Sequence, residues 1–288
     1  MSWLIFTLLA INLWAISNII DKNVVSKRVR SAAVPLIIGG FGSLFYAAIS
    51  FLFLGATFNL EGLALGIFYT ALLLLYLKAM QLEEASRVIA FFSFIPIFVA
   101  VLAYLFLGES FGPEKYVGII LVTIGAAMIS VRKGIGKKLM ISKALYLMLL
   151  FVMLYAVYTI ALKYSTGYTG FISIFAGMQF GLFLGGIALL FVYKIELKKI
   201  NMKTTALVLT SQFTGVTGLL SFIYAVSIGP ISLVSAIENT QPVFLLLFTT
   251  LLTIFKPHII KEDISKGPLF LKALAIIIMV IGAYLVSI

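Results

Sequence analysis

The stretch AVSIGPISLVSAIENTQPVF, at residues 225–244, repeats an earlier stretch, AMQLEEASRVIAFFSFIPIF, at residues 79–98. The two align without a gap, and the alignment places Pro96 against Pro242. Internal similarity at this separation is typical of a chain built from two copies of one structural unit.

A second pair of segments extends the repeat toward the end of each half. IGAAMISV at 124–131 aligns with IGAYLVSI at 281–288. The sequence therefore predicts a first five-helix repeat over residues 1–131 and a second over residues 144–288. A basic linker, residues 132–143, is expected to join them on the cytoplasmic side.

The composition is that of a polytopic membrane protein. Of 288 residues, 62% are hydrophobic and only 11% are charged, and the mean hydropathy is +1.18. A soluble domain has about 25% charged residues. Cys is absent, which excludes disulfides and thiol chemistry. The net charge of +11 lies in short loops between apolar segments, so we expect no nucleic-acid partner.

Ten apolar segments are long enough to be membrane-spanning helices, because a helix needs about 20 such residues to cross the hydrocarbon core. The predicted fold is all-α, with ten transmembrane helices arranged as two inverted five-helix repeats, since five spans per half make the halves enter the membrane in opposite directions. The predicted spans are 2–21, 33–54, 62–80, 87–107, 115–131, 144–163, 170–193, 204–227, 231–255 and 269–287.

The basic residues predict the orientation. All but two of the 21 Lys and Arg residues lie in the loops that follow odd-numbered spans, and the exceptions are Lys115 and Lys163. By the positive-inside rule these loops are cytoplasmic. We therefore expect a multi-pass protein of the cytoplasmic (plasma) membrane, with both termini extracytoplasmic.

A polar run, SAIENTQPVF at residues 235–244, interrupts the ninth predicted span. Glu238 would lie about 10–12 Å into the membrane, on the same helix face as Ser235, Gln241 and Pro242. A carboxylate at that depth is expensive and should face the bundle interior or a wet cavity. We predict that Glu238 binds a cation or amine, or carries a coupling proton, and that Gln241 hydrogen-bonds the solute. The alternative is a structural Glu tied to a neighbouring helix.

Other deep polar and amphipathic side chains are candidates for the same cavity wall. For each of them the alternative is structural packing or hydrogen bonding. These candidates are Trp14, Asn18, Tyr76, Tyr155, Gln179 and Gln212.

Several further residues favour structural roles. Asp21 is predicted to form an interfacial pair with its sequence neighbour, and Glu109 to cap a helix or pair with a basic group. Gly177, Gly181 and Gly185 have a spacing of four, which predicts a surface where two helices approach closely.

Three local features resemble the EamA-type branch of the drug/metabolite transporter superfamily. LWAISNIIDK, at 13–22, is similar to the family's Leu-Trp-Gly-x-x-Asn pattern, with Ala15 in place of the glycine. Pro96 and Pro242 match the prolines of spans four and nine. YLFLGESFGPEKYVGIILVTIGAAMI, at 104–129, resembles the family's Leu-Gly-Glu and glycine sequence. The resemblance implies the ten-helix fold and transport of a metabolite. Many members are assigned cytoplasmic termini, and the charges here predict the opposite.

Together these features predict a secondary transporter that exports a small metabolite, an amino acid or related solute, by alternating access. Pro96 and Pro242 are expected to be the points where two helices bend. A lipid or lipid-linked carrier flippase and a multidrug exporter remain alternatives. An integral membrane enzyme is less supported, because one His and scattered acids form no catalytic cluster. No catalytic residue, metal or cofactor is expected. The expected partners are a small-molecule solute and membrane lipid, and coupling to protons is left open. The expected oligomeric state is a monomer.

Overall fold

The computed structural model describes residues 2–82, 88, 91–130, 143–196, 200–255 and 266–288, and these residues form helices and connections with no strand among them. The helices follow from long apolar segments, whose backbone groups must be hydrogen-bonded within the segment when water is absent. The described part of the first half contains α1 Ser2–Lys27, α2 Ala33–Phe53, α3 Leu60–Leu82, α5 Ile95–Leu107 and α6 Pro113–Ser130. The second half contains α7 Lys143–Thr169, α8 Phe171–Tyr193, α9 Met202–Ile228, α10 Ile231–Glu238, α11 Gln241–Phe255 and α12 Lys266–Ser287.

Within the described residues, eight helical segments are long and apolar enough to cross a membrane, with α10 and α11 counted together. The multi-pass membrane class is therefore confirmed, and the total of ten crossings stays a prediction. α5 is apolar but only 13 residues long. Of the predicted linker, residues 132–142 lie outside the described part of the chain, and Lys143 is already the first residue of α7.

The predicted span over residues 231–255 is one of these segments, and within it the chain breaks at Asn239 and Thr240, between α10 and α11. Pro242 is the cause: proline has no N–H to donate to the carbonyl four residues earlier, and its ring clashes with that carbonyl, which here belongs to Glu238. The proline is instead accommodated in the first turn of α11, where no such bond is needed.

The predicted helix over residues 87–107 is interrupted in the same way. The chain is helical at residues 91–92, forms a turn at Ser93 and Phe94, and then enters α5 with Pro96 in its first turn. Each proline therefore breaks its helix two to three residues before its own position.

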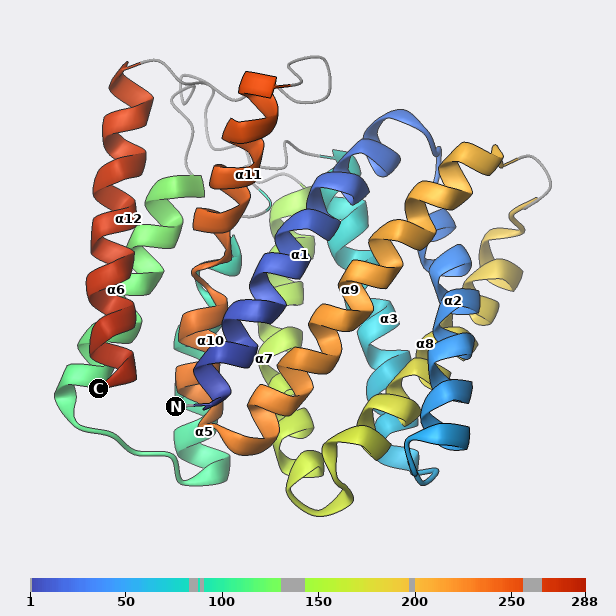
Figure 1. The fold of residues 1–288 in the computed structure, drawn as a ribbon, viewed down its shortest axis with the longest axis horizontal. Helices are drawn as coiled ribbons and strands as arrows, with labels where there is room; N and C mark the ends of the chain where they lie inside the picture. The colour runs from blue at the N-terminus through green and yellow to red at the C-terminus, as the bar shows by residue number, and fades with distance from the viewer. Residues whose placement is uncertain (1, 83–87, 89–90, 131–142, 197–199, 256–265) are drawn as a thin grey trace.

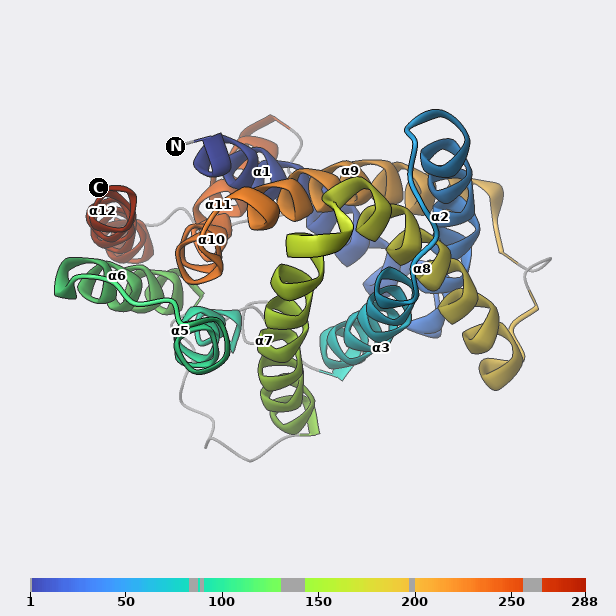
Figure 2. The ribbon, with the colours of Figure 1, turned by 90° about the horizontal axis from the view of Figure 1, so that it is seen from below.

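The helices pack as an elongated bundle with paired neighbours (Figures 1 and 2). α6 packs along α12 at one edge, α2 and α3 pack along α8 at the other edge, and α1 crosses between them along α9. α5 contacts α7 and α10. Both termini lie in the lower half of Figure 1, and α1, α3, α8 and α11 all end at the upper side.

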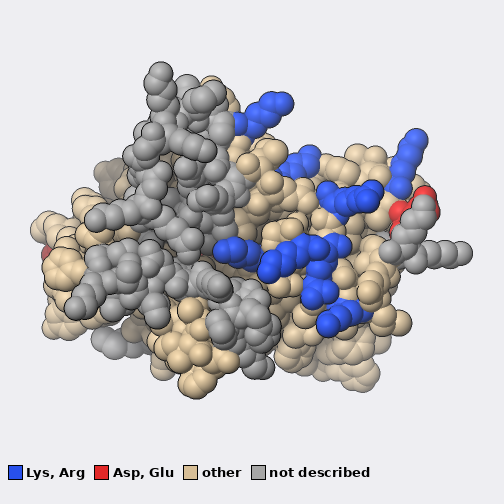
Figure 3. Space-filling view, turned by 90° about the horizontal axis from the view of Figure 1, so that it is seen from above, with Lys and Arg blue, Asp and Glu red and all other residues tan. Residues whose placement is uncertain are grey.

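That upper side carries most of the basic side chains. Figure 3 shows it face-on, with Lys and Arg gathered where α1 ends and α9 begins. Lys78, near the end of α3, lies there against the ring of Tyr193, with 5.3 Å between Nζ and the ring centroid. We call this side the basic end of the molecule and the opposite side the terminal end.

The predicted close approach along the glycine stripe of α8 is confirmed. A Cβ atom on Gly177 would lie 3.0 Å from the Cα atom of Gly62, and one on Gly181 would collide with backbone atoms of α3. Small residues let two helices meet at backbone distance and form many van der Waals contacts in the absence of a hydrophobic driving force. This contact fixes α3 and α8 as one wall of the bundle.

Candidate solute-binding cavity

A cavity of about 190 Å³ lies between α1, α2, α3, α7, α9 and α10. It is far larger than the 10–15 Å³ or so that one water molecule needs. Most of the residues predicted as cavity wall line it, although they come from widely separated parts of the sequence. These residues are Trp14, Asn18, Tyr76, Tyr155, Gln212, Glu238 and Gln241.

Glu238 lies at the end of α10, beside the break in the helix. The hydroxyl of Tyr155 on α7 donates a hydrogen bond of 2.6 Å to its Oε1 atom. Its Oε2 atom is buried and has no hydrogen-bond partner among the described residues. Burying a carboxylate oxygen without a hydrogen-bond donor costs free energy. A bound molecule that donates a hydrogen bond to this atom would therefore be stabilised in the cavity.

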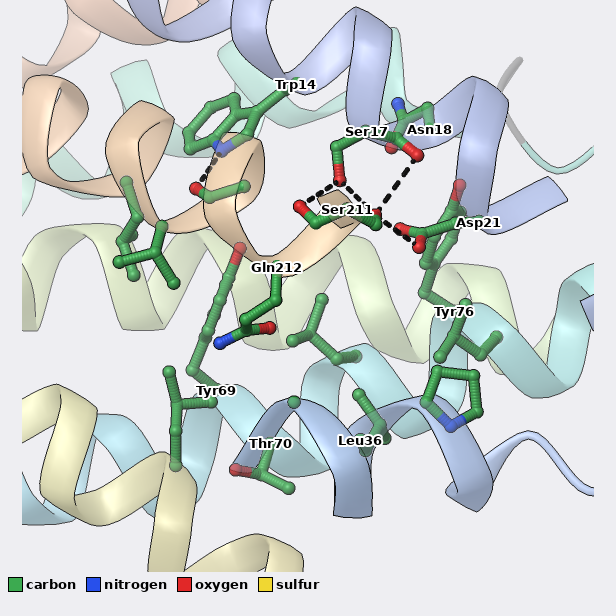
Figure 4. A pocket seen from close by; sticks show the side chains of 18 of the residues that line it. Trp14, Ser17, Asn18, Asp21, Leu36, Tyr69, Thr70, Tyr76, Ser211 and Gln212 are labelled. Atoms are coloured by element: carbon green, nitrogen blue, oxygen red, sulfur yellow. Dashed lines mark hydrogen bonds between the residues drawn. The ribbon is translucent and has the colours of Figure 1, made fainter. Parts of the chain in front are cut away.

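A second carboxylate, Asp21 on α1, also lines the cavity. It accepts a hydrogen bond of 2.6 Å from the hydroxyl of Ser211 on α9, and Ser211 in turn lies 2.8 Å from the hydroxyl of Ser17 (Figure 4). The sequence assigned Asp21 to the membrane interface. The structure brings it into the cavity because α1 packs along α9, which presents Ser211 to its side chain.

Trp14 joins α1 to α9, and Gln212 joins α9 to α2. The indole Nε1 of Trp14 donates to the main-chain carbonyl of Gly215 at 3.1 Å, and the ring packs against Phe222 with centroids 5.2 Å apart. Nε2 of Gln212 donates to the hydroxyl of Ser43 on α2 at 2.8 Å. Both side chains therefore combine cavity lining with structural contacts, the two roles left open by the sequence.

Aromatic rings form a continuous row along one side of the cavity, and all of them except Tyr158 line it. Each ring lies within 5.0–5.6 Å of the next, measured between centroids, which is the range of favourable aromatic pairs. The order along this aromatic wall is Tyr76, Phe92, Phe151, Tyr155, Tyr158 and Tyr69.

Ser235 and Gln241 extend the site past the helix break. They line a smaller space of about 40 Å³ together with Asn18, Glu238 and Pro242. Nε2 of Gln241 and the hydroxyl of Ser235 are buried without a partner among the described residues. The break therefore gathers unpartnered polar atoms next to the carboxylate of Glu238.

Gln179 is placed elsewhere. It is fully buried in α8, and it is not among the residues that line the cavity. Neither its amide nitrogen nor its amide oxygen has a hydrogen-bond partner in the described part of the chain. α8 packs along α2 and α3, and the full burial of Gln179 places it within the packing between helices.

The lining extends from the middle of the bundle toward the basic end. On α2 it includes Pro35 and Gly39, near the start of that helix, and on α9 it includes Val208. The terminal end is packed instead, with Tyr224 between Phe6 and Phe171 at centroid distances of 4.5 and 4.8 Å. The cavity therefore faces the basic end.

Two charged side chains fasten the terminal end. Glu109, in the connection after α5, accepts hydrogen bonds from the backbone N–H groups of Ile231 and Ser232 at 2.7 and 3.0 Å, which confirms its predicted capping role. Nζ of Lys163 donates to the carbonyls of Val226 and Gly229 at 2.8 Å each. The turn between α9 and α10 is thereby hydrogen-bonded to α7 and to the connection after α5.

Sequence reasoning missed Ser17, Ser43 and Ser211 and misplaced Asp21. The one available signal was the spacing of Ser17 and Asp21, four residues apart on one face of a helix. The serines gave no signal of their own, because a serine in an apolar helix ordinarily bonds a carbonyl of its own helix.

Comparison with known proteins supports this fold. Residues 1–131 match the model of the EamA-like transporter family. No curated protein matches the chain. Among 29 chains of solved structures that match is a protein crystal structure with 16% sequence identity, covering 99% of this chain and 96% of that chain, with a TM-score of 0.73. At this identity the likeness concerns the fold alone.

The family match covers the first predicted repeat from end to end. It contains Trp14, Asn18 and Asp21 of the cavity and the proline-broken entry to α5. Residues 1–131 are thus similar to the EamA-like transporter family, and the resemblance predicted from the motifs is confirmed.

Proposed function

We propose that the chain is a secondary transporter that exports a small metabolite, an amino acid or a related solute, across the cytoplasmic membrane by alternating access. The observation that carries this proposal is the unpartnered carboxylate oxygen of Glu238, at the break of a discontinuous helix, in a cavity inside an otherwise apolar bundle. Broken helices at the membrane midplane are where transporters of inverted-repeat folds place their sites.

The packing of the helices supports an inverted repeat. In a repeat related by a two-fold axis, helices near the axis pack against their own counterparts, and two such pairs occur: α2 with α8, and α6 with α12. The two breaks also meet, because Nδ2 of Asn239 donates to the main-chain carbonyl of Ser93 at 3.3 Å. Ser93 and Asn239 are equivalent in the repeat alignment, so the axis would pass between them.

Rocking of the two halves about this axis would open the cavity alternately to each side. With the basic end cytoplasmic, as the positive-inside rule proposes, this structure faces the cytoplasm, where an exported solute loads. The fastened terminal end then corresponds to the closed extracytoplasmic side. Ten spans are enough for a complete pathway, and we propose a monomer.

A lipid or lipid-linked carrier flippase has one observation in its favour. A groove of about 380 Å³ between α1 and α11 is lined by apolar side chains such as Ile20, Phe248 and Leu252. Its described lining contains no polar residue to hold a headgroup, so we favour the cavity that contains Glu238 as the site. The family match favours transport over an enzymatic role.

The test is solute flux in proteoliposomes with wild type, Glu238→Gln and the control Glu114→Gln, which changes an exposed carboxylate in the first turn of α6. Labelled amino acids, other metabolites and cationic drugs are screened with and without a pH gradient. We expect saturable flux that Glu238→Gln abolishes or uncouples from the gradient and that Glu114→Gln leaves intact. Flux unchanged in Glu238→Gln would make that residue structural, and no flux for any solute would shift support to the flippase.

A further inference from the structure

We infer that the solute is an amine-bearing organic cation, and that the cavity discriminates against the corresponding amino acid, which carries an additional carboxylate. This inference rests on the proposed transport function and narrows its solute class from amino acids and related solutes to the related amines. The formal charges among the described lining residues are the carboxylates of Asp21 and Glu238, and none of these residues is Lys, Arg or His. A buried anion is stable only when a counter-charge or hydrogen-bond donors satisfy it.

Two unsatisfied acceptors in the cavity fit the ammonium group. Among the described residues, Oε2 of Glu238 has no hydrogen-bond partner, and neither has the hydroxyl of Tyr76, a residue that is only 6% exposed. Tyr76 extends toward Asp21 in Figure 4. An ammonium group has three donors and no acceptor, so it could donate hydrogen bonds to both of these atoms.

The aromatic wall fits the remainder of such a solute. Tyr76, Phe92 and Phe151 stand in contact with one another beside the two carboxylates, with Phe92 and Phe151 stacked at 5.0 Å between centroids. Ring faces attract organic cations and also bury apolar groups. Carboxylates combined with aromatic faces therefore recognise a positive charge on an organic body.

Several of the donors that could hold a solute carboxylate are already engaged. The backbone N–H groups of Asn239, Thr240 and Val243 at the helix break all donate to main-chain carbonyls. The indole of Trp14 donates to the carbonyl of Gly215, and Nε2 of Gln212 to the hydroxyl of Ser43. Nε2 of Gln241 and the hydroxyl of Tyr76 are buried donors without a partner among the described residues, but neutral donors do not balance the charge of a carboxylate placed near two others.

The experiment compares solute pairs that differ by one carboxylate: phenethylamine with phenylalanine, and agmatine with arginine. Purified full-length protein is used for flux in proteoliposomes and, separately, for binding by calorimetry. We expect the amine of at least one pair to show an affinity about tenfold or more above that of its amino acid, because one hydrogen-bonded charge contact is worth about that factor. Asp21→Asn should weaken amine binding by a similar factor, while Glu114→Gln should not.

The outcomes separate this inference from the transport proposal. Saturable flux of the amino acids with equal or better affinity than the amines would overturn the cation inference and leave transport standing. Amine binding that Asp21→Asn weakens, without flux of any solute, would support the cation site and overturn transport. Absence of both binding and flux would overturn both. Thermal unfolding of each variant shows that a loss of binding does not come from misfolding.

Discussion

The hydroxyl of Tyr155 lies 2.6 Å from Oε1 of Glu238 and links the middle of α7 to the end of α10 at the helix break. Tyr155 is also a member of the aromatic wall, with its ring stacked 5.5 Å from that of Phe151. One side chain therefore orients the carboxylate and shapes the surface on which a solute would rest. The other carboxylate oxygen is left unpartnered in the described structure.

Replacing Tyr155 by Phe removes this hydrogen bond and keeps the ring. A hydrogen bond to a charged group is worth about 1.5–3 kcal/mol, so we expect the solute KM to rise about 10- to 100-fold. The KM is measured from initial rates of uptake into proteoliposomes. Tyr164→Phe makes the same change at a 65% exposed position of α7 and should leave KM unaltered. An unchanged KM in Tyr155→Phe would show that this bond does not support binding.

Pro242→Ala restores the N–H that could bond to the carbonyl of Glu238 and continue α10 into α11. Because rocking of the halves is proposed to use this break, we expect the maximal rate to fall more than solute affinity. Flux and calorimetric binding measured on the same preparation separate the two quantities. Pro113→Ala at the first position of α6, where proline is readily tolerated, is the control. Equal turnover in both variants would argue against a moving break.

Glu109→Gln weakens the cap on α10 by removing its charge. A helix cap is worth about 0.5–2 kcal/mol, and a negative charge at a helix N-terminus adds to it, so the free energy of unfolding should decrease by about 1 kcal/mol. A lower Tm in thermal unfolding of the purified protein would report this change. The exposed Glu114 offers a matched replacement, Glu114→Gln, which breaks no described contact between helices. If both variants unfold at the same temperature, the cap contributes no stability.

Gly181→Leu should prevent α3 and α8 from approaching each other, because even a Cβ atom at this position would collide with the carbonyl oxygen of Leu63. Overpacking of a rigid contact costs about 1–3 kcal/mol or more. We expect a large loss of monodisperse protein in size-exclusion chromatography. Gly167→Leu, at a position of α7 with no atom within 4 Å of a Cβ, should preserve the yield. Normal yield from Gly181→Leu would show that the helices can separate.

The absence of Cys from the chain allows a direct test of the predicted orientation. Ser110→Cys lies in the connection between α5 and α6 at the terminal end, and Met202→Cys, at an 81% exposed position, lies at the basic end. A membrane-impermeant maleimide should label Ser110→Cys in intact cells and label Met202→Cys only after permeabilisation. The reverse pattern would place both termini in the cytoplasm.

The proline breaks and the acidic position of the site were readable from the sequence. Glu238 and Pro242 stand out because a carboxylate and a residue without an N–H are both costly in an apolar helix. The repeat alignment also places Phe92 opposite Glu238, and both residues line the cavity. Such residues can be identified from the sequence of one helix alone, because the free-energy cost of placing them there arises within that helix.

The sequence by itself determined the helical membrane class, most helix positions and the points where two helices break. These features follow from local chemistry: apolar length, basic loops and the missing N–H of proline. Only the tertiary structure decided that Asp21 faces Ser211 across α1 and α9, that Gln179 turns into the packing of α8, and that Glu109 caps α10. Each of these depends on which helix lies next to which, and helix contacts are set by packing across distant parts of the chain.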